Sequence, residues 1–173
     1  SEIGCAGNNG SWRTSVIPIL TDIYSNFKVT QSVKVSQAGA KGTYMTNIFH
    51  GERVRIRGIE ESDFENYFAW EQDTESSRLD YEIWFPTSTT SRRDWVHSQA
   101  RQTGEGDLFR FTIVTLDGTV VGSLNTHTVH RRNGTFMYGL FIDAAYRKNG
   151  YATDALRILF RYFFHERGYQ KVN

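Results

Sequence analysis

Four segments of the chain have hydrophobic patterns typical of strands: the first alternates polar and apolar residues one by one, as in a strand with one buried face, and the last is almost entirely apolar. These segments span residues 53–57, 109–116, 120–129 and 135–142. The last three follow one another with only short gaps. The pattern therefore predicts a sheet in which one early strand accompanies three strands that are close in sequence.

Turn-forming residues occupy the two gaps between these three strands. Asp117-Gly118 lies in the first gap and Asn133-Gly134 lies in the second. Both dipeptides favour a tight type I′ turn, because Gly, Asn and Asp tolerate the positive φ that both central positions need. Two such hairpins predict an antiparallel meander.

Two helices are predicted between the first strand and the meander. Ser62 and Glu65 have the spacing of a capping box, which satisfies free N–H groups at a helix start. Thr90 or Ser91 can cap a second helix that runs toward Thr103. The apolar residues that these helices would bury are Phe64, Tyr67, Phe68, Trp95 and Val96. Together the elements predict an α+β fold, a mixed sheet with an antiparallel meander and flanking helices.

The first 44 residues show no comparable pattern. They are rich in Ser, Gly, Asn and Thr, and Pro18 interrupts their one apolar stretch. We interpret residues 1–44 as an N-terminal extension, such as a tag, a linker or upstream read-through, before a domain over residues 45–173. The alternative is an arm that packs on the domain or on a neighbouring subunit.

The composition limits the classes of partner. Lys and Arg number 20 against 19 Asp and Glu among the 173 residues, so the formal net charge is +1. A nearly neutral chain gives no reason to expect nucleic acid or an anionic membrane as a partner. Cys5 is the only cysteine in the sequence, which excludes an intrachain disulfide and a thiolate metal cluster, and no His, Cys and Glu spacing suggests another metal site. We expect a cytoplasmic protein.

The clearest chemical signal lies where a strand leads into a helix. A strand over residues 136–142 is followed by a short turn and then by a helix over 152–167 whose apolar residues share one face. Gly168 is placed to end that helix.

The turn before this helix reads Arg147-x-x-Gly150-x-Ala152. The first N–H groups of a helix have no intrahelical acceptor and favour anions. Small residues such as Gly150 and Ala152 would let a phosphate approach them closely. We therefore predict a pyrophosphate cradle here, and the alternative is a tight-turn glycine beside solvated basic residues.

These residues resemble the [QR]-x-x-G-x-[GA] loop of the GNAT superfamily of acetyl-CoA-dependent N-acetyltransferases. The order of elements from residue 53 is also similar, and it resembles most the subgroup with ribosomal-protein-alanine and spermidine acetyltransferases. The resemblance covers residues 45–173. It implies a GNAT-like fold and direct transfer of an acetyl group from acetyl-CoA to a primary amine of a protein N-terminus, a polyamine or a small molecule.

The resemblance also implies a cofactor site. Its residues would be Phe141, Ile142, Arg147, Lys148, Asn149, Gly150, Tyr151 and Ala152. Backbone N–H groups near Phe141 and Ile142 would hold the pantetheine arm and polarise the thioester carbonyl. A general base would take a proton from the amine, and a general acid, commonly a Tyr, would return one to the leaving thiolate.

Two side chains are candidates for the proton transfers. An imidazole exchanges protons near neutral pH, and His127 shares its strand face with the polar residues Ser123 and Asn125. His130 would point to the opposite face, because it is three residues further along. Tyr138 lies in the strand that flanks the active cleft in the family. The structural alternatives are exposed strand-end histidines and a core tyrosine.

A further group lies where the family places a variable substrate-side loop. It comprises Asp80, Tyr81, Glu82, Trp84 and Phe85. Carboxylates beside aromatic rings suit a cationic amine, although a surface loop with a few buried aromatics is the favoured interpretation.

The sequence ends at Asn173, where a further strand, a helix and a closing hairpin would follow in the family. We therefore expect a domain truncated at its C-terminus, with an open edge on the strand 135–142 that favours self-association. The alternatives to an active enzyme are a non-catalytic module that binds CoA or phosphate and a structural domain that binds neither.

Overall fold

A computed structural model of the protein describes residues 47–80, 83, 85–104, 106 and 108–173. The predicted N-terminal extension, residues 1–44, lies outside the described residues. So do Tyr81, Glu82 and Trp84 of the predicted substrate-side loop.

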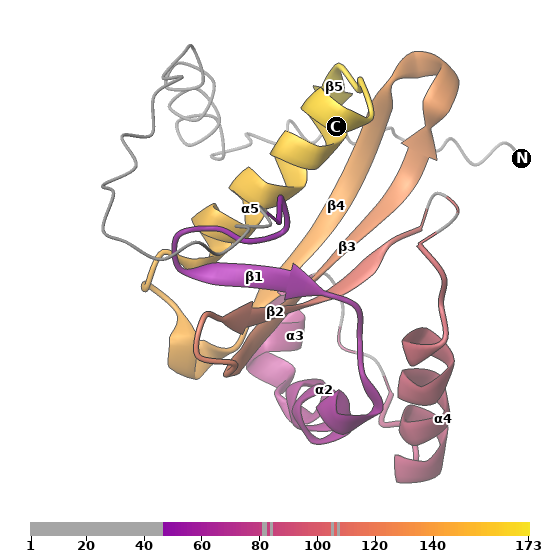
Figure 1. The fold of residues 1–173 in the computed structure, drawn as a ribbon. Helices are drawn as coiled ribbons and strands as arrows, with labels where there is room; N and C mark the ends of the chain where they lie inside the picture. Colours follow the sequence, from indigo (N-terminus) through magenta and orange to yellow (C-terminus); the bar gives the residue numbers. More distant parts are fainter. Residues whose placement is uncertain (1–46, 81–82, 84, 105, 107) are drawn as a thin grey trace, which may run out of the picture. The chain divides into compact units, whose positions relative to one another are not determined.

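Five strands form one mixed sheet in the order β1-β2-β3-β4-β5 (Figure 1). The strands are β1 (Val54–Arg57), β2 (Arg110–Thr115), β3 (Val120–His130), β4 (Thr135–Ile142) and β5 (Lys171–Val172). Each of the first four pairs antiparallel with the next, whereas β5 runs parallel to β4. The predicted α+β fold and the antiparallel meander are thus confirmed.

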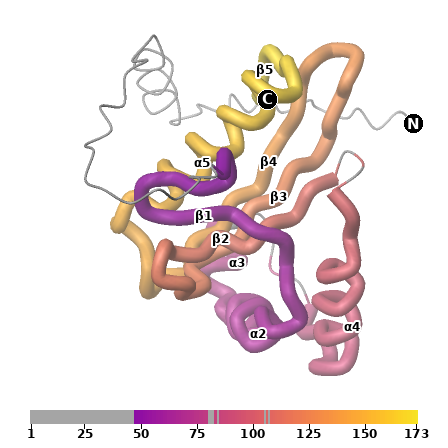
Figure 2. Tube along the Cα trace, in the orientation of Figure 1, coloured from indigo at the N-terminus to yellow at the C-terminus, as the bar shows by residue number. Residues whose placement is uncertain are grey.

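Helices cover both faces of the sheet. The elements are η1 (Glu61–Asp63), α2 (Phe64–Gln72), α3 (Thr74–Asp80), α4 (Thr89–Ala100), η2 (Arg131–Asn133), η3 (Ala144–Tyr146), α5 (Tyr151–Arg161) and η4 (Tyr162–Glu166). α5 packs along β1 and β4 on one face (Figure 2), which we call the α5 face. The opposite face, which contacts α2, is called the α2 face.

Both predicted hairpins form, but neither uses a type I′ turn. Gly118 and Gly134 have positive φ values of 100° and 59°, whereas Asp117 and Asn133 do not have positive φ. At the first hairpin the Gly118 N–H donates to the Thr115 carbonyl at 3.0 Å, which closes a turn one residue earlier than predicted. The glycine alone supplies the left-handed residue, as in three-residue hairpin loops.

Both predicted helix starts are capped, but by residues close to the predicted ones. The capping box is formed by Glu60 and Asp63, whose carboxylate accepts from the Glu60 N–H at 2.9 Å, and not by Ser62 and Glu65. Ser88 caps α4 by accepting from the Ser91 N–H at 3.1 Å. Several Ser, Thr and acidic residues adjoin each start, so the sequence could not single out the one that caps.

The predicted helix 152–167 consists of α5 and the wider turn η4, and Gly168 ends it with φ of 69°. Its apolar face packs on a fully buried row of the sheet that includes Phe136 and Leu124. The ring of Phe136 stacks on Phe163 with centroids 4.1 Å apart.

β5 pairs with β4 at Thr135 and Phe136. This corrects the expectation that the whole edge of the strand 135–142 lacks a neighbour. Among the described strands, none pairs with residues 137–142 on the side away from β3.

Candidate functional site

The loop between β4 and α5 is fixed at its start by Asp143. Its carboxylate accepts from the Ala145 N–H and from Nε1 of Trp70, both at 2.9 Å. Trp70 belongs to α2 and also packs against Phe141, with ring centroids 5.1 Å apart. The end of β4 is therefore tied to the helix on the α2 face.

Two residues of this loop have left-handed backbone conformations. φ is 66° at Lys148 and 79° at Gly150, values that only glycine adopts without steric cost. The carboxamide of Asn149 donates to the carbonyls of Tyr146 and Arg147 at 3.1 and 3.4 Å. Glycine at residue 150 therefore avoids the steric cost that Lys148 bears in the same conformation, in addition to any close approach of a ligand.

The loop leaves a run of backbone donors free at the start of α5. The first N–H that finds an acceptor in the helix is that of Asp154, which donates to the Gly150 carbonyl at 3.1 Å. Among the hydrogen bonds of the described residues, none is donated by the backbone N–H groups of residues 148–153. Residues 148–150 are exposed. Such a set of donors at a helix start fits the oxygens of a pyrophosphate.

The Arg147 side chain already makes hydrogen bonds to other parts of the domain, although the residue is exposed. Its Nε donates to the Ile142 carbonyl at 3.0 Å, and a terminal nitrogen donates to Oγ of Ser76 in α3 at 2.6 Å. The guanidinium thus joins the end of β4 to α3. This geometry indicates that Arg147 shapes the loop, whereas the sequence analysis placed it in the cofactor site or, as the alternative, among solvated basic residues.

A second arginine adjoins the loop from a distant part of the sequence. A Cβ built on Gly150 would lie 3.6 Å from Cδ and Nε of Arg53, which is exposed at the start of β1. Sequence patterns gave no sign of this contact, because Arg53 fits the alternation of its own strand.

Asp154 holds Arg53 in place. Its carboxylate, only 4% exposed, accepts from the N–H groups of Glu52, Arg53 and Val54 at 3.3, 2.8 and 3.0 Å. A Cβ on Gly51 would lie 2.3 Å from this carboxylate, so the backbone can approach only because residue 51 is glycine. The first turn of α5 and the start of β1 therefore form one hydrogen-bonded unit.

The open edge of β4 offers further donors. Asp143 donates its N–H to Val121 of β3, whereas the carbonyl of Phe136 accepts from Asn173 on the other side. Because ladder groups alternate along a strand, the N–H groups of Leu140 and Ile142 face the open edge. The N–H of Phe141 faces β3, so of the two predicted backbone donors only Ile142 points to that edge.

A pocket of about 340 Å³ connects this edge with the loop. Its lining residues are Ser76 and Leu79 of α3, Leu140, Phe141 and Ile142 of β4, and Arg147 and Ala152. Ile142 and Ala152 thus belong to the same pocket, which is mostly apolar and carries polar groups at one end. Such a site suits an elongated ligand with a charged head.

The two predicted proton-transfer residues lie on opposite faces of the sheet. Tyr138 packs against Phe160 on the α5 face, with ring centroids 5.7 Å apart, and burial raises the pKa of its hydroxyl. His127 pairs with Met137 and is half-buried on the α2 face.

The parity argument for the histidines is wrong. A bulge at Thr128, where φ is 49°, adds one residue to β3. His127 pairs with Met137 and His130 pairs with Thr135, and these partners are two residues apart on β4. Both histidines therefore lie on the α2 face.

The sequence matches the acetyltransferase (GNAT) domain family over residues 53–173. The chain belongs to this family.

Individual relatives agree with this result. The chain is 37% identical over 131 residues to the SPbeta prophage-derived uncharacterized N-acetyltransferase YokL of Bacillus subtilis strain 168, a match that covers 76% of this chain and 68% of that protein. With the family match, it identifies the chain as an acyltransferase enzyme.

Solved GNAT structures share the fold. A GNAT acetyltransferase from Bacillus anthracis superposes with a TM-score of 0.58 at 19% identity, covering 72% of this chain and 70% of that one. Spermidine N-acetyltransferase from Vibrio cholerae, solved with CoA and spermine, gives 0.57 at 12% identity, covering 69% and 68%. The subgroup predicted from the sequence is therefore among the structural neighbours.

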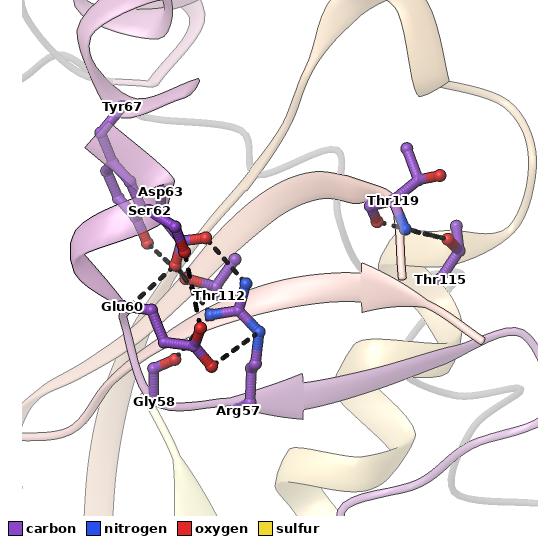
Figure 3. A network of polar contacts seen from close by, with 9 residues as sticks. All are labelled: Arg57, Gly58, Glu60, Ser62, Asp63, Tyr67, Thr112, Thr115 and Thr119. Carbon is purple, nitrogen blue, oxygen red and sulfur yellow. Dashed lines mark hydrogen bonds and ion pairs between the residues drawn. The ribbon is translucent and has the colours of Figure 1, made fainter. Parts of the chain in front are cut away.

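In the GNAT domain of this protein a buried polar network supports the α2 face (Figure 3). Arg57 donates two hydrogen bonds of 2.7 Å to Asp63, which is 2% exposed and also accepts from Thr112 at 2.9 Å. Burial raises the pKa of Asp63, but these bonds outweigh it, so that pKa lies below its ordinary value. The Tyr67 hydroxyl is 3.3 Å from that of Thr112, and burial raises the pKa of Tyr67 to about 12.

No residue of this network was singled out as a site residue in the sequence, and its role is to fix η1 and α2 on the sheet. Among the described residues, no group of three or more His, Cys, Asp or Glu side chains could hold a metal ion. None of the described helices has both the length and the apolar character needed to cross a membrane.

Proposed function

We propose that this GNAT domain binds acetyl-CoA at the loop 147–152 and the open edge of β4, and transfers the acetyl group to a primary amine. The proposal rests on the run of six free backbone N–H groups at the start of α5, which adjoins the pocket along β4. Acetyl-CoA supplies the acetyl group as an activated thioester.

Each part of the site has a separate task. The N–H groups of residues 148–153 hold the pyrophosphate, and the cationic side chains of Lys148 and Arg53 add charge beside it. The N–H groups of Leu140 and Ile142 hold the pantetheine arm and polarise the acetyl carbonyl. Arg147 is a positioning residue, since its hydrogen bonds keep the loop against β4 and α3.

Proton transfer is assigned to the two candidates on β3 and β4. His127 takes a proton from the ammonium of the acceptor. The neutral amine nitrogen then bonds to the acetyl carbon and releases its second proton to water, and the carbon–sulfur bond breaks with its electron pair on the sulfur. Burial raises the pKa of Tyr138, so its hydroxyl keeps the proton that the thiolate needs. The opposite faces of these side chains are compatible with this scheme, because the edge of β4 adjoins both faces.

Calorimetry of the full chain with acetyl-CoA, CoA and pantetheine tests the cradle. We expect CoA to bind much more tightly than pantetheine, which lacks the pyrophosphate. Equal affinities would contradict the cradle. Thiol release with spermidine and with a short peptide that has a free N-terminal amine tests the transfer, and CoA binding without thiol release would favour a non-catalytic binding module.

A pair of substitutions at Gly150 separates its conformational role from its contact with the ligand. Asn adopts left-handed φ more readily than any β-branched residue. We expect Gly150→Val to weaken CoA binding at least about tenfold, because the displaced donors face charged phosphates and each such hydrogen bond contributes about 1.5–3 kcal/mol. Gly150→Asn should weaken it less. A Gly150→Val protein that melts like wild type and binds CoA equally well would exclude this cradle.

A further inference from the structure

The centre of the α2 face of β4 is occupied by a side chain from β3. Asn125 pairs with Gly139, and a Cβ built on Gly139 would lie 2.5 Å from Oδ1 of Asn125. The carboxamide therefore lies over the backbone of β4, in the space that any side chain at residue 139 would fill.

This carboxamide is available to a ligand. Among the hydrogen bonds of the described residues, none involves the Asn125 side chain, although the residue is half-buried. The described residues include a few buried side-chain nitrogen and oxygen atoms that lack a hydrogen-bond partner, and those of Asn125 are not among them. The polar atoms of Asn125 are therefore accessible to solvent. A carboxamide can both donate and accept hydrogen bonds.

Its neighbours over β4 are apolar. Met137 and Phe141 flank Gly139 on this face, since side chains on one face of a strand are two residues apart. Strands lie only about 4.8 Å apart, so a side chain that crosses β4 approaches its open edge. Asn125 thus brings hydrogen-bonding atoms toward the edge where the acetyl group is proposed to lie.

The polar groups on β3 form a continuous row with it. Ser123, Asn125 and His127 share the α2 face, and the bulge at Thr128 adds His130 to the same side. His127, the proposed base, is therefore the adjacent residue of the row. An amine bound to Asn125 would lie within reach of that imidazole.

We propose that Asn125 positions the acceptor amine for attack, and that Gly139 is glycine so that the carboxamide can lie over β4. This inference rests on the proposed acetyl transfer. His127 takes one proton from the acceptor ammonium, and the Asn125 carbonyl accepts a hydrogen bond from one of the two N–H groups that remain. The nitrogen lone pair then bonds to the acetyl carbon and the nitrogen releases its second proton to water, while the carbon–sulfur electron pair leaves with the thiolate, which Tyr138 protonates.

Steady-state kinetics on the full chain test this role, with spermidine and with a peptide that has a free N-terminal amine as acceptors. Asn125→Ala should lower kcat/KM for the amine about tenfold, the effect of one lost hydrogen bond to a polar or charged group. The dissociation constant of CoA, measured by calorimetry, should stay within about twofold. Asn133→Ala is the matched control, since Asn133 is exposed in the hairpin turn, and it should change neither quantity.

Gly139→Ala provides a second variant, which should also lower kcat/KM for the amine because it displaces the same carboxamide. The new methyl group displaces the end of the Asn125 side chain, which is flexible, so the fold should persist in a melting curve. Because both changes act through one carboxamide, the double variant should lose no more activity than Asn125→Ala alone.

Four outcomes overturn the inference. Wild-type kinetics in Asn125→Ala, or losses that add in the double variant, would show that Asn125 does not position the amine while leaving acetyl transfer intact. A loss confined to CoA affinity would place Asn125 in the cofactor site. If wild type binds CoA but releases no thiol with either amine, the proposed transfer itself fails and this inference fails with it.

Discussion

The two faces of the sheet hold their helices by different means. On the α5 face most contacts are apolar, and Phe136 lies among the rings of Phe160, Phe163 and Tyr169, while the buried carboxylate of Asp154 in α5 binds backbone N–H groups at the start of β1. On the α2 face the buried carboxylate of Asp63 pairs with a cationic side chain, and it receives hydrogen bonds from a guanidinium, a hydroxyl and a backbone N–H.

The two kinds of contact contribute differently to the stability of the domain and to the positions of its helices. Apolar burial contributes free energy in proportion to area and tolerates small shifts. A buried ion pair contributes little net stability, but removing one partner lowers the free energy of unfolding strongly. The pair also restricts the two groups to one relative geometry. The proposed acceptor residues lie on the α2 face, where polar groups set the positions of the helices.

The largest expected effect is on the α5 face. Phe136→Ala should lower the free energy of unfolding by about 3–5 kcal/mol, because a fully buried ring leaves a cavity in a packed cluster. Chemical denaturation of the full chain measures the loss. Phe85→Ala is the matched control, since Phe85 is 94% exposed, and it should have almost no effect. Similar losses in both variants would contradict the assignment of this core.

The next effect is on the α2 face. Asp63→Asn should cost about 2–3 kcal/mol, because the Arg57 guanidinium loses its charged partner. The loss lies below that of a fully buried pair, since the Arg57 side chain is 24% exposed and retains some hydration. Asp94→Asn, an exposed position in α4, serves as the control. An Asp63→Asn protein as stable as wild type would show that packing alone holds η1 and α2.

The same carboxylate predicts an acid dependence. The pKa of Asp63 is lowered in the folded state, so its contribution is complete above the unfolded pKa of about 4 and is lost as pH falls through the folded pKa. Wild type should therefore lose stability below about pH 4 more steeply than Asp63→Asn. Parallel curves for the two proteins would contradict the low pKa.

The smallest effect concerns Tyr67. Tyr67→Phe removes only the hydroxyl that is 3.3 Å from Thr112 and should cost about 1 kcal/mol. Because burial raises the pKa of Tyr67 to about 12, its contribution is complete below about pH 10 and is lost as pH rises toward the folded pKa. The free energy of unfolding should therefore fall less between about pH 10 and 12 in Tyr67→Phe than in wild type. An equal fall in the two proteins would show that Tyr67 is not the group responsible.

The elements that the sequence predicted well are those set by local pattern. Hydrophobic patterns and the turn residues between them placed the strands, and Gly118, Gly134 and Gly168 all adopt positive φ where turns or a helix end were expected. The loop before α5 was recognised because a glycine, a helix start and an apolar face are adjacent in sequence.

Contacts between distant segments were not predictable in this way. Asp154 binds the backbone of residues 52–54, about a hundred positions earlier in the chain, and no periodicity in the sequence indicates such a contact. Likewise, the bulge at Thr128 reversed the expected direction of His130, because one extra residue changes strand parity. The need for glycine at residue 139 could not be recognised from the local sequence either, because the space for a side chain there is taken by Asn125 on the neighbouring strand.

The central claim is that the free N–H groups at the start of α5 bind the pyrophosphate of CoA. Amide NMR spectra of the 15N-labelled full chain, recorded with CoA and with pantetheine, test it directly. We expect CoA to shift the amide signals of residues 148–153 strongly and pantetheine to leave most of them unchanged. Saturation with CoA that leaves these signals in place, while amides elsewhere shift, would contradict the account.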